Sequence, residues 1–92
     1  MSDTDDAKSR IAELREQIDA VDGDIVRLLN RRAELALAIR AEKPAAHLSL
    51  YDPKREEEIF ARVAEHNAGP LYGDNLREIY EAILHVMKEL RG

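Results

Sequence analysis

The stretch Ile11–Lys43, IAELREQIDAVDGDIVRLLNRRAELALAIRAEK, decides how this chain folds. Apolar residues recur there at alternating steps of three and four, and the same phase continues to Leu35 and Ile39. The first six residues of this set are Ile11, Leu14, Ile18, Val21, Ile25 and Leu28. Such spacing places them on one face of a helix. The sequence therefore predicts one long helix with an apolar seam.

Two cations stand on this seam. Arg32 occupies the next seam position after Leu28, where a packing residue is expected. Lys43 follows eleven residues later, which is about three turns, or roughly 16 Å, further along nearly the same face. A guanidinium on an apolar face is costly to bury without a counter-anion. Arg32 and Lys43 are therefore candidates for binding an anion.

The length of 92 residues predicts a single domain over residues 1–92, with residues 1–8 as a flexible tail. A helix over Ile11–Lys43 is about 50 Å long, whereas a compact chain of this size has a radius of gyration of about 12 Å. Much of the helix must therefore be covered by a second chain. The net charge of −5 argues against a nucleic-acid partner, which requires a basic face.

The composition excludes several kinds of chemistry. Cysteine is absent, which excludes disulfides and thiolate catalysis. His47, His66 and His85 are isolated in the sequence, so we expect no metal and no cofactor. The N-terminus MSDTDDAKSR has no apolar core of a signal peptide, and no apolar run is long enough to span a membrane. We therefore expect a cytoplasmic protein.

Two shorter helices follow the long one, so the predicted fold is all-α with three helices. Helix signals decide their bounds: Pro44 ends the first helix at Lys43, and Asp52-Pro53 starts a second that runs to about Asn67. The second helix is expected to bury Ile59, Phe60 and Val63. Asp74 or Asn75 is expected to cap a third helix, whose apolar residues are Leu76, Ile79, Tyr80, Ile83, Leu84, Met87 and Leu90.

The polar residues Asp52, Arg55 and Glu56 gather at the first turn of the second helix. Arg15 lies 17 residues before Arg32 and 28 before Lys43, or roughly 25 and 42 Å along one straight helix, so it cannot share their pocket within one chain. In an antiparallel dimer the partner's Arg15 can complete it. Such a pocket suits a small dicarboxylate that bears a hydroxyl group.

Each of these residues also has an ordinary interpretation. Arg15 alone is typical of a solvated helix charge, and Asp52 alone is explained as a helix cap. Arg55 and Glu56 are common in a first helical turn, where the helix dipole favours the glutamate. The spacing of the whole set, with Arg32 on an apolar seam, is what favours a binding site.

Three segments of the sequence resemble one known family. They are LREQIDAVDGDIVRLLNRRAELALAIRAEK (14–43), YDPKREEEIF (51–60) and GPL (69–71). The chain resembles the all-helical class of chorismate mutase from about Ile11 to Leu90. The resemblance implies an intertwined homodimer of three-helix chains with two sites, each completed by the partner's Arg15. It also implies an isomerase that converts chorismate to prephenate in phenylalanine and tyrosine biosynthesis, without a cofactor.

The resemblance assigns roles to six residues. Arg32 and the partner's Arg15 hold the two substrate carboxylates, and Lys43 contacts a carboxylate and the ether oxygen. Glu56 and the backbone of Asp52 bind the ring hydroxyl, while Arg55 lines the pocket. A pericyclic rearrangement needs no nucleophile, metal or proton transfer, which fits the lack of candidates for them. Catalysis is then a matter of conformation and charge stabilisation.

The third helix departs from the family pattern at two positions. Met87 stands where a small polar residue is usual, and Arg91 stands where a glutamine or glutamate reaches the ether oxygen. We expect Met87 to line the site and Arg91 to replace the usual catalytic group.

Other functions remain open: an isochorismate pyruvate lyase, a 4-amino-4-deoxychorismate mutase, or a non-catalytic helical dimer that binds pathway ligands. Docking to a partner enzyme of the aromatic pathway is also open.

Overall fold

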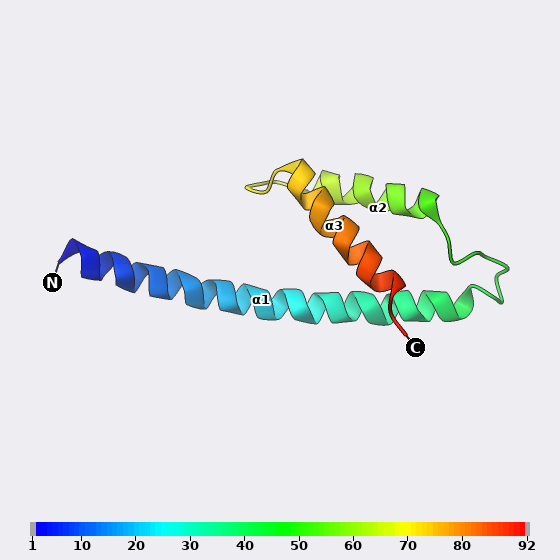
Figure 1. Cartoon of the computed structure of the whole chain (residues 1–92), viewed down its shortest axis with the longest axis horizontal. Coiled ribbons are helices and arrows are strands. Elements are labelled where there is room, and N and C mark those ends of the chain that lie inside the picture. The colour runs from blue at the N-terminus through cyan, green and yellow to red at the C-terminus, as the bar shows by residue number, and fades with distance from the viewer. Residues whose placement is uncertain (1, 92) are drawn as a thin grey trace. The chain divides into compact units, whose positions relative to one another are not determined.

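A computed structural model describes residues 2–91 of the chain, and this part contains helices and no strand. The helices are α1 (Asp3–Glu42), α2 (Pro53–His66) and α3 (Gly73–Lys88), which Figure 1 labels in chain order. The predicted all-α fold of one long and two short helices is confirmed. The chain divides into two compact units, Met1–Glu34 and Leu35–Gly92.

Helix α1 is continuous through Gly23, as the unbroken phase of Val21 and Ile25 indicates. It begins at Asp3, eight residues before the start of the apolar seam at Ile11. The Ser2 hydroxyl accepts a hydrogen bond from the Asp5 N–H at 3.2 Å, and three aspartates occupy the first turn. A serine cap and acidic residues at a helix N-terminus satisfy free N–H groups and the helix dipole. These local signals extend the helix beyond its apolar seam.

Helix α2 starts as the sequence predicts. The Asp52 carboxylate accepts a hydrogen bond from the Arg55 N–H at 3.1 Å, and Pro53 is the first helical residue. Helix α3 does not start as predicted: its N-cap is Tyr72, which makes no side-chain cap bond. The helix begins at Gly73, so Asp74 already lies inside the first turn, where its charge is favourable.

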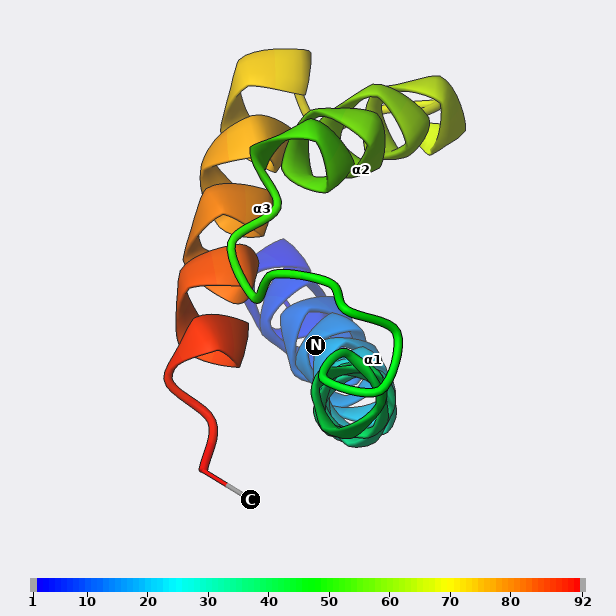
Figure 2. The same cartoon turned by 90° about the vertical axis from the view of Figure 1, so that its right-hand side faces the viewer.

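In the unit Leu35–Gly92, helices α2 and α3 pack against each other (Figure 2). Leu84 and Met87 of α3 are the buried apolar residues of the described chain, with exposed fractions of 7% and 8%. Ile59, Phe60 and Val63 of α2 were expected to be buried but are only half-buried. A two-helix layer covers one side of each helix, so little of the chain's apolar surface is fully enclosed.

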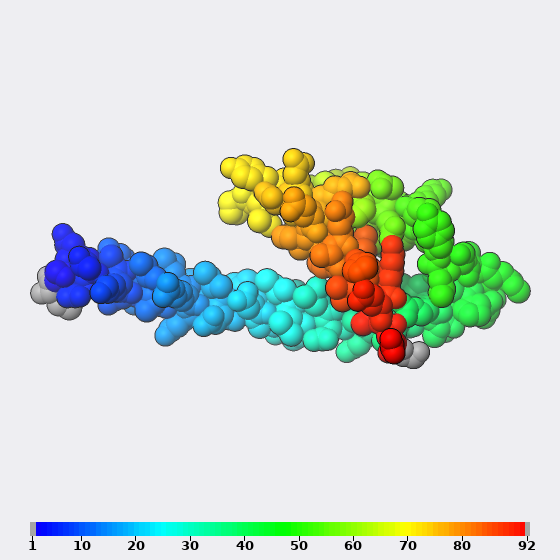
Figure 3. All heavy atoms as spheres, viewed as in Figure 1, coloured from blue at the N-terminus to red at the C-terminus, as the bar shows by residue number. Residues whose placement is uncertain are grey.

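Residues 3–34 of α1 lie in the unit Met1–Glu34 and are drawn in blue to cyan in Figure 3. No residue of α1 is buried. The six seam residues of this unit have exposed fractions between 46% and 63%; they are Ile11, Leu14, Ile18, Val21, Ile25 and Leu28. Contiguous apolar surface of this kind is typical of an interface with another molecule.

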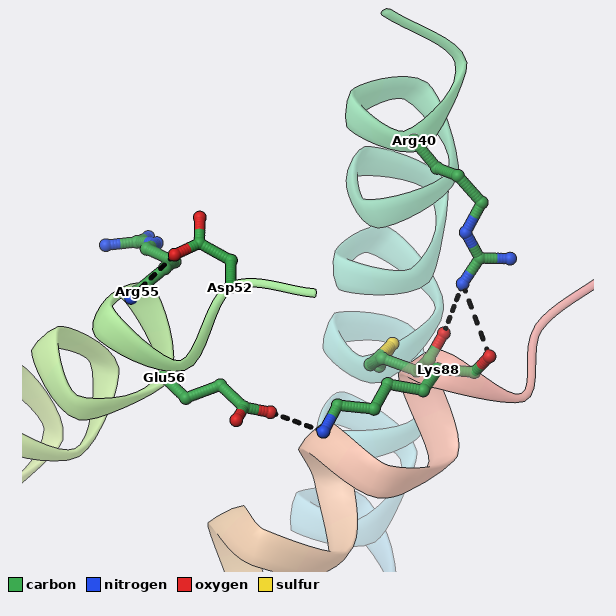
Figure 4. A network of polar contacts seen from close by, with 6 residues as sticks. Arg40, Asp52, Arg55, Glu56 and Lys88 are labelled. Atoms are coloured by element: carbon green, nitrogen blue, oxygen red, sulfur yellow. Dashed lines mark hydrogen bonds and ion pairs between the residues drawn. The ribbon is translucent and has the colours of Figure 1, made fainter. Parts of the chain in front are cut away.

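Hydrogen bonds from Arg40 hold the end of α3 against the C-terminal part of α1. Its guanidinium donates to the carbonyl oxygens of Met87 (3.0 Å), Lys88 (3.4 Å) and Leu90. The last carbonyls of a helix have no partner within the helix, and a cation there also satisfies the helix dipole. Figure 4 shows this fork of bonds from Arg40 to the last turn of α3. Arg40 therefore fixes where the C-terminal turn of α3 lies.

Arg40→Ala should lower the free energy of unfolding by about 2 kcal/mol, because hydrogen bonds from a charged donor are among the stronger ones. Thermal unfolding at a fixed protein concentration measures the change. Arg62→Ala, which removes an exposed arginine of α2, is the matched control and should shift stability by less than about 0.5 kcal/mol. Equal losses in the two variants would contradict the role of Arg40.

Candidate functional site

Helix α1 carries two of the predicted site residues, Arg15 and Arg32. Arg15 is exposed, whereas Arg32 is half-buried beside the apolar seam. Neither guanidinium forms an ion pair or a side-chain hydrogen bond with any other of residues 2–91. The neighbouring Arg31, in contrast, pairs with Glu34 at 3.2 Å. The five donors of the Arg32 guanidinium are thus available to a ligand.

Lys43 follows the last residue of α1 and begins the loop to α2. Its ammonium donates to the Ser49 carbonyl at 2.9 Å, which leaves two of its three donors available. The loop folds back over this position: the Lys43 carbonyl accepts from the N–H groups of Ala46 and Leu48 at 3.1 and 3.0 Å.

A hollow of about 300 Å³ lies beside Lys43. Its lining is apolar except for Glu42 and Lys43, and the remaining residues are Leu35, Ala38, Ile39, Ala46 and Leu48. Apolar surface next to an ammonium provides a place for a molecule with a hydrocarbon ring and an anionic group. The sequence reasoning identified Lys43 but not this hollow, because the hollow depends on how the loop 44–51 turns back.

The first turn of α2 presents Asp52, Arg55 and Glu56. Asp52 is occupied as the helix cap, so its carboxylate is not available to a ligand without uncapping the helix. Arg55 forms a loose pair with Glu58 at 3.6 Å, and both side chains are half-exposed. An exposed pair of this kind contributes little and exchanges readily, so it leaves Arg55 free to turn to a ligand.

Glu56 is the less exposed carboxylate of this turn, with a side-chain exposure of 28%. Its Oε1 lies 2.6 Å from the Nζ of Lys88 on α3, a contact that Figure 4 shows crossing between the two helices. The sequence reasoning missed Lys88. No local spacing relates residues 56 and 88; only the packing of α2 on α3 brings them together.

The two predicted site residues of the C-terminal segment differ in their surroundings. Met87 is buried in the core of its unit, so most of its side chain packs against protein. Arg91 lies beyond the last residue of α3 and is exposed. The roles of Met87 in lining the site and of Arg91 in catalysis stay predictions.

The described residues offer little to a metal ion. No group of three or more His, Cys, Asp or Glu side chains within residues 2–91 is placed to hold one. In the same part of the chain, no helix is both long enough and apolar enough to span a membrane.

Comparison with known proteins points to one family. The family model described as chorismate mutase type II matches residues 14–92. The bifunctional chorismate mutase/prephenate dehydratase of Aquifex aeolicus is 40% identical over 80 residues, which cover 87% of this chain and 21% of that protein. The chain thus spans about a fifth of the length of this bifunctional relative.

Two other relatives are matched over most of their own length. The chorismate mutase of Methanocaldococcus jannaschii is 31% identical over 74 residues, which cover 76% of this chain and 75% of that protein. The solved structure of chorismate mutase (form I) from Thermus thermophilus superimposes with a TM-score of 0.81 at 36% identity, covering 85% of this chain and 98% of that one. The structural likeness extends over nearly the whole of the Thermus chain.

Proposed function

The chain belongs to the chorismate mutase type II family, and from this premise we propose that it converts chorismate to prephenate. In this reaction the carbon–oxygen bond of the enolpyruvyl ether breaks while a carbon–carbon bond forms to the ring. The observation that carries the proposal is the state of Arg32: it is half-buried at an apolar seam and forms no ion pair within residues 2–91. An unpaired cation beside an apolar surface favours binding of an anionic ligand.

The proposed catalysis is electrostatic and conformational. Chorismate carries two carboxylates, and holding both of them stabilises the compact conformer in which the two reacting carbons approach each other. Negative charge grows on the ether oxygen as its bond to carbon breaks. A cation already placed at that oxygen stabilises the transition state more than the substrate, which lowers the barrier.

The residues take the following proposed roles. Arg32 and Arg15 of the partner subunit bind the two carboxylates, since a guanidinium holds a carboxylate with two parallel bonds. Lys43 contacts a carboxylate and the ether oxygen with the two donors that Ser49 leaves available. Glu56 and the Asp52 N–H bind the ring hydroxyl. Arg55 and Met87 line the pocket, and Arg91 supplies a second positive charge to the ether oxygen.

We propose that the site is completed only in a homodimer. Arg15 and Arg32 are 17 residues apart on α1, which is about 25 Å along the helix, too far to grip the same small dicarboxylate. The exposed seam of α1 supplies the surface for association.

The place of the reaction in metabolism is also part of the proposal. The Aquifex relative carries a mutase and a dehydratase in one protein. We propose that this chain supplies prephenate in the cytoplasm for phenylalanine and tyrosine synthesis.

Purified protein should consume chorismate and release a product that acid converts to phenylpyruvate, which identifies prephenate. Arg32→Ala should lower kcat/KM by more than about 100-fold, equivalent to about 2.7 kcal/mol of transition-state stabilisation. Arg31→Ala is the matched control: it removes the adjacent guanidinium, which pairs with Glu34, and should stay within about threefold. Turnover of isochorismate instead of chorismate, or loss of activity in both variants alike, would contradict the proposal.

Arg91→Ala should lower kcat by more than about tenfold, or about 1.4 kcal/mol of barrier, because it removes a charge from the ether oxygen. Steady-state kinetics on chorismate gives the number, and light scattering verifies that the variant keeps the oligomeric state of the parent. An unchanged kcat would show that Arg91 has no part in catalysis.

A further inference from the structure

Lys88 brings a positive charge to the one carboxylate that the proposed function assigns to the substrate ring. Its Nζ lies 2.6 Å from the Oε1 of Glu56, within the range of a short charge-assisted hydrogen bond. The lysine side chain is 62% exposed, whereas that of Glu56 is 28% exposed. Glu56 is therefore the partly withdrawn member of the pair, and the ammonium reaches in toward it from α3.

The base of Lys88 is fixed by other contacts. Arg40 donates to the carbonyls of Met87 at 3.0 Å and of Lys88 at 3.4 Å, and Met87 is buried immediately before Lys88. The last turn of α3 therefore has a defined position against α1 and α2 within the unit Leu35–Gly92 (Figure 4). The approach of Lys88 to Glu56 follows from this anchoring rather than from a spacing along one helix.

A carboxylate has two oxygens and about four sites that accept hydrogen bonds. With Lys88 on Oε1, the Oε2 atom of Glu56 remains able to accept from a ligand. A neutral hydroxyl can donate to Oε2 without electrostatic repulsion from the Lys88 ammonium. An ammonium group donating there would lie within about 6 Å of Nζ, since both cations would bind one carboxylate, and their repulsion would offset the attraction of Glu56.

We infer that Lys88 is a specificity-determining residue, which makes the site accept a ring hydroxyl and reject a ring amine in its place. The inference rests on the proposed function, because Glu56 must face the ring substituent. Lys88 weakens the attraction of Glu56 for a second cation, because its ammonium already balances the carboxylate charge. The Oε2 atom of Glu56 remains an acceptor for a neutral hydroxyl. Discrimination of this kind comes from the unfavourable contact with the wrong substrate.

The test compares two substrates that differ at this substituent, chorismate and 4-amino-4-deoxychorismate. The quantity measured is the ratio of kcat/KM for the amino substrate to kcat/KM for chorismate. If the amino substrate is bound but not converted, the KM for chorismate divided by the inhibition constant of the amino substrate replaces this ratio. The ratio is insensitive to the amount of folded enzyme, so a general loss of activity does not imitate a change in specificity.

Lys88→Met keeps an unbranched chain of similar length without the charge and should raise the ratio at least tenfold. Lys88→Arg keeps the charge and should leave the ratio within about threefold of the parent. Lys54→Met is the matched control, because it removes an exposed lysine from the same first turn of α2 as Glu56. It should leave the ratio unchanged.

The outcomes separate this inference from the function on which it rests. An unchanged ratio in Lys88→Met, with chorismate still converted, overturns the role of Lys88 and leaves the mutase standing. An equal rise in Lys54→Met also overturns it, since net charge would then explain the effect. A parent protein that converts neither substrate contradicts the proposed function and the inference together.

Discussion

The exposed apolar seam of α1 is the constraint on which the rest of the structure depends. Each seam residue of α1 from Ile11 to Leu28 is close to half exposed or more, and none is buried. Hydrophobic burial is the main stabilising term in folding, and within residues 2–91 the buried apolar residues are Leu84 and Met87, which contribute little of it. In the proposed homodimer, association through α1 supplies the burial that the single chain lacks. In that dimer, folding and formation of the proposed site are coupled, because the same surface carries Arg15 and Arg32.

Arg31 and Arg32 of α1 differ in a way that favours a ligand-binding role for Arg32 alone. Arg31 and Arg32 are neighbours in the sequence, yet Arg31 points to Glu34 and Arg32 has no ion-pair partner within residues 2–91. One is an ordinary exposed pair of a helix, which contributes a few tenths of a kcal/mol. The other is a half-buried cation that is proposed to bind an anion. The family match over residues 14–92 supports the proposal that this anion is chorismate.

The sequence was sufficient wherever local chemistry decides the structure. The regular spacing of the seam residues indicates that α1 continues through Gly23, as the structure shows. Asp52-Pro53 predicts the start of α2, because the aspartate cap and the proline act on adjacent backbone groups. The sequence did not predict the contacts that depend on tertiary packing. The bonds of Arg40 to residues 47 to 50 positions away, and the pair of Glu56 with Lys88, have no local signal. The start of α3 at Gly73 was missed because extended backbone at Tyr72, not a side-chain cap, precedes it.

Mixing two inactive variants tests the shared site most directly. Arg15→Ala and Arg32→Ala each remove one carboxylate-binding residue from both sites of a homodimer. Unfolding an equal mixture and refolding it produces half mixed dimers on random pairing, and each of these has one site with both arginines intact. The account predicts about a quarter of the parent activity per chain, well above either variant alone. Activity of the mixture equal to the average of the two variants would contradict a site built from two chains.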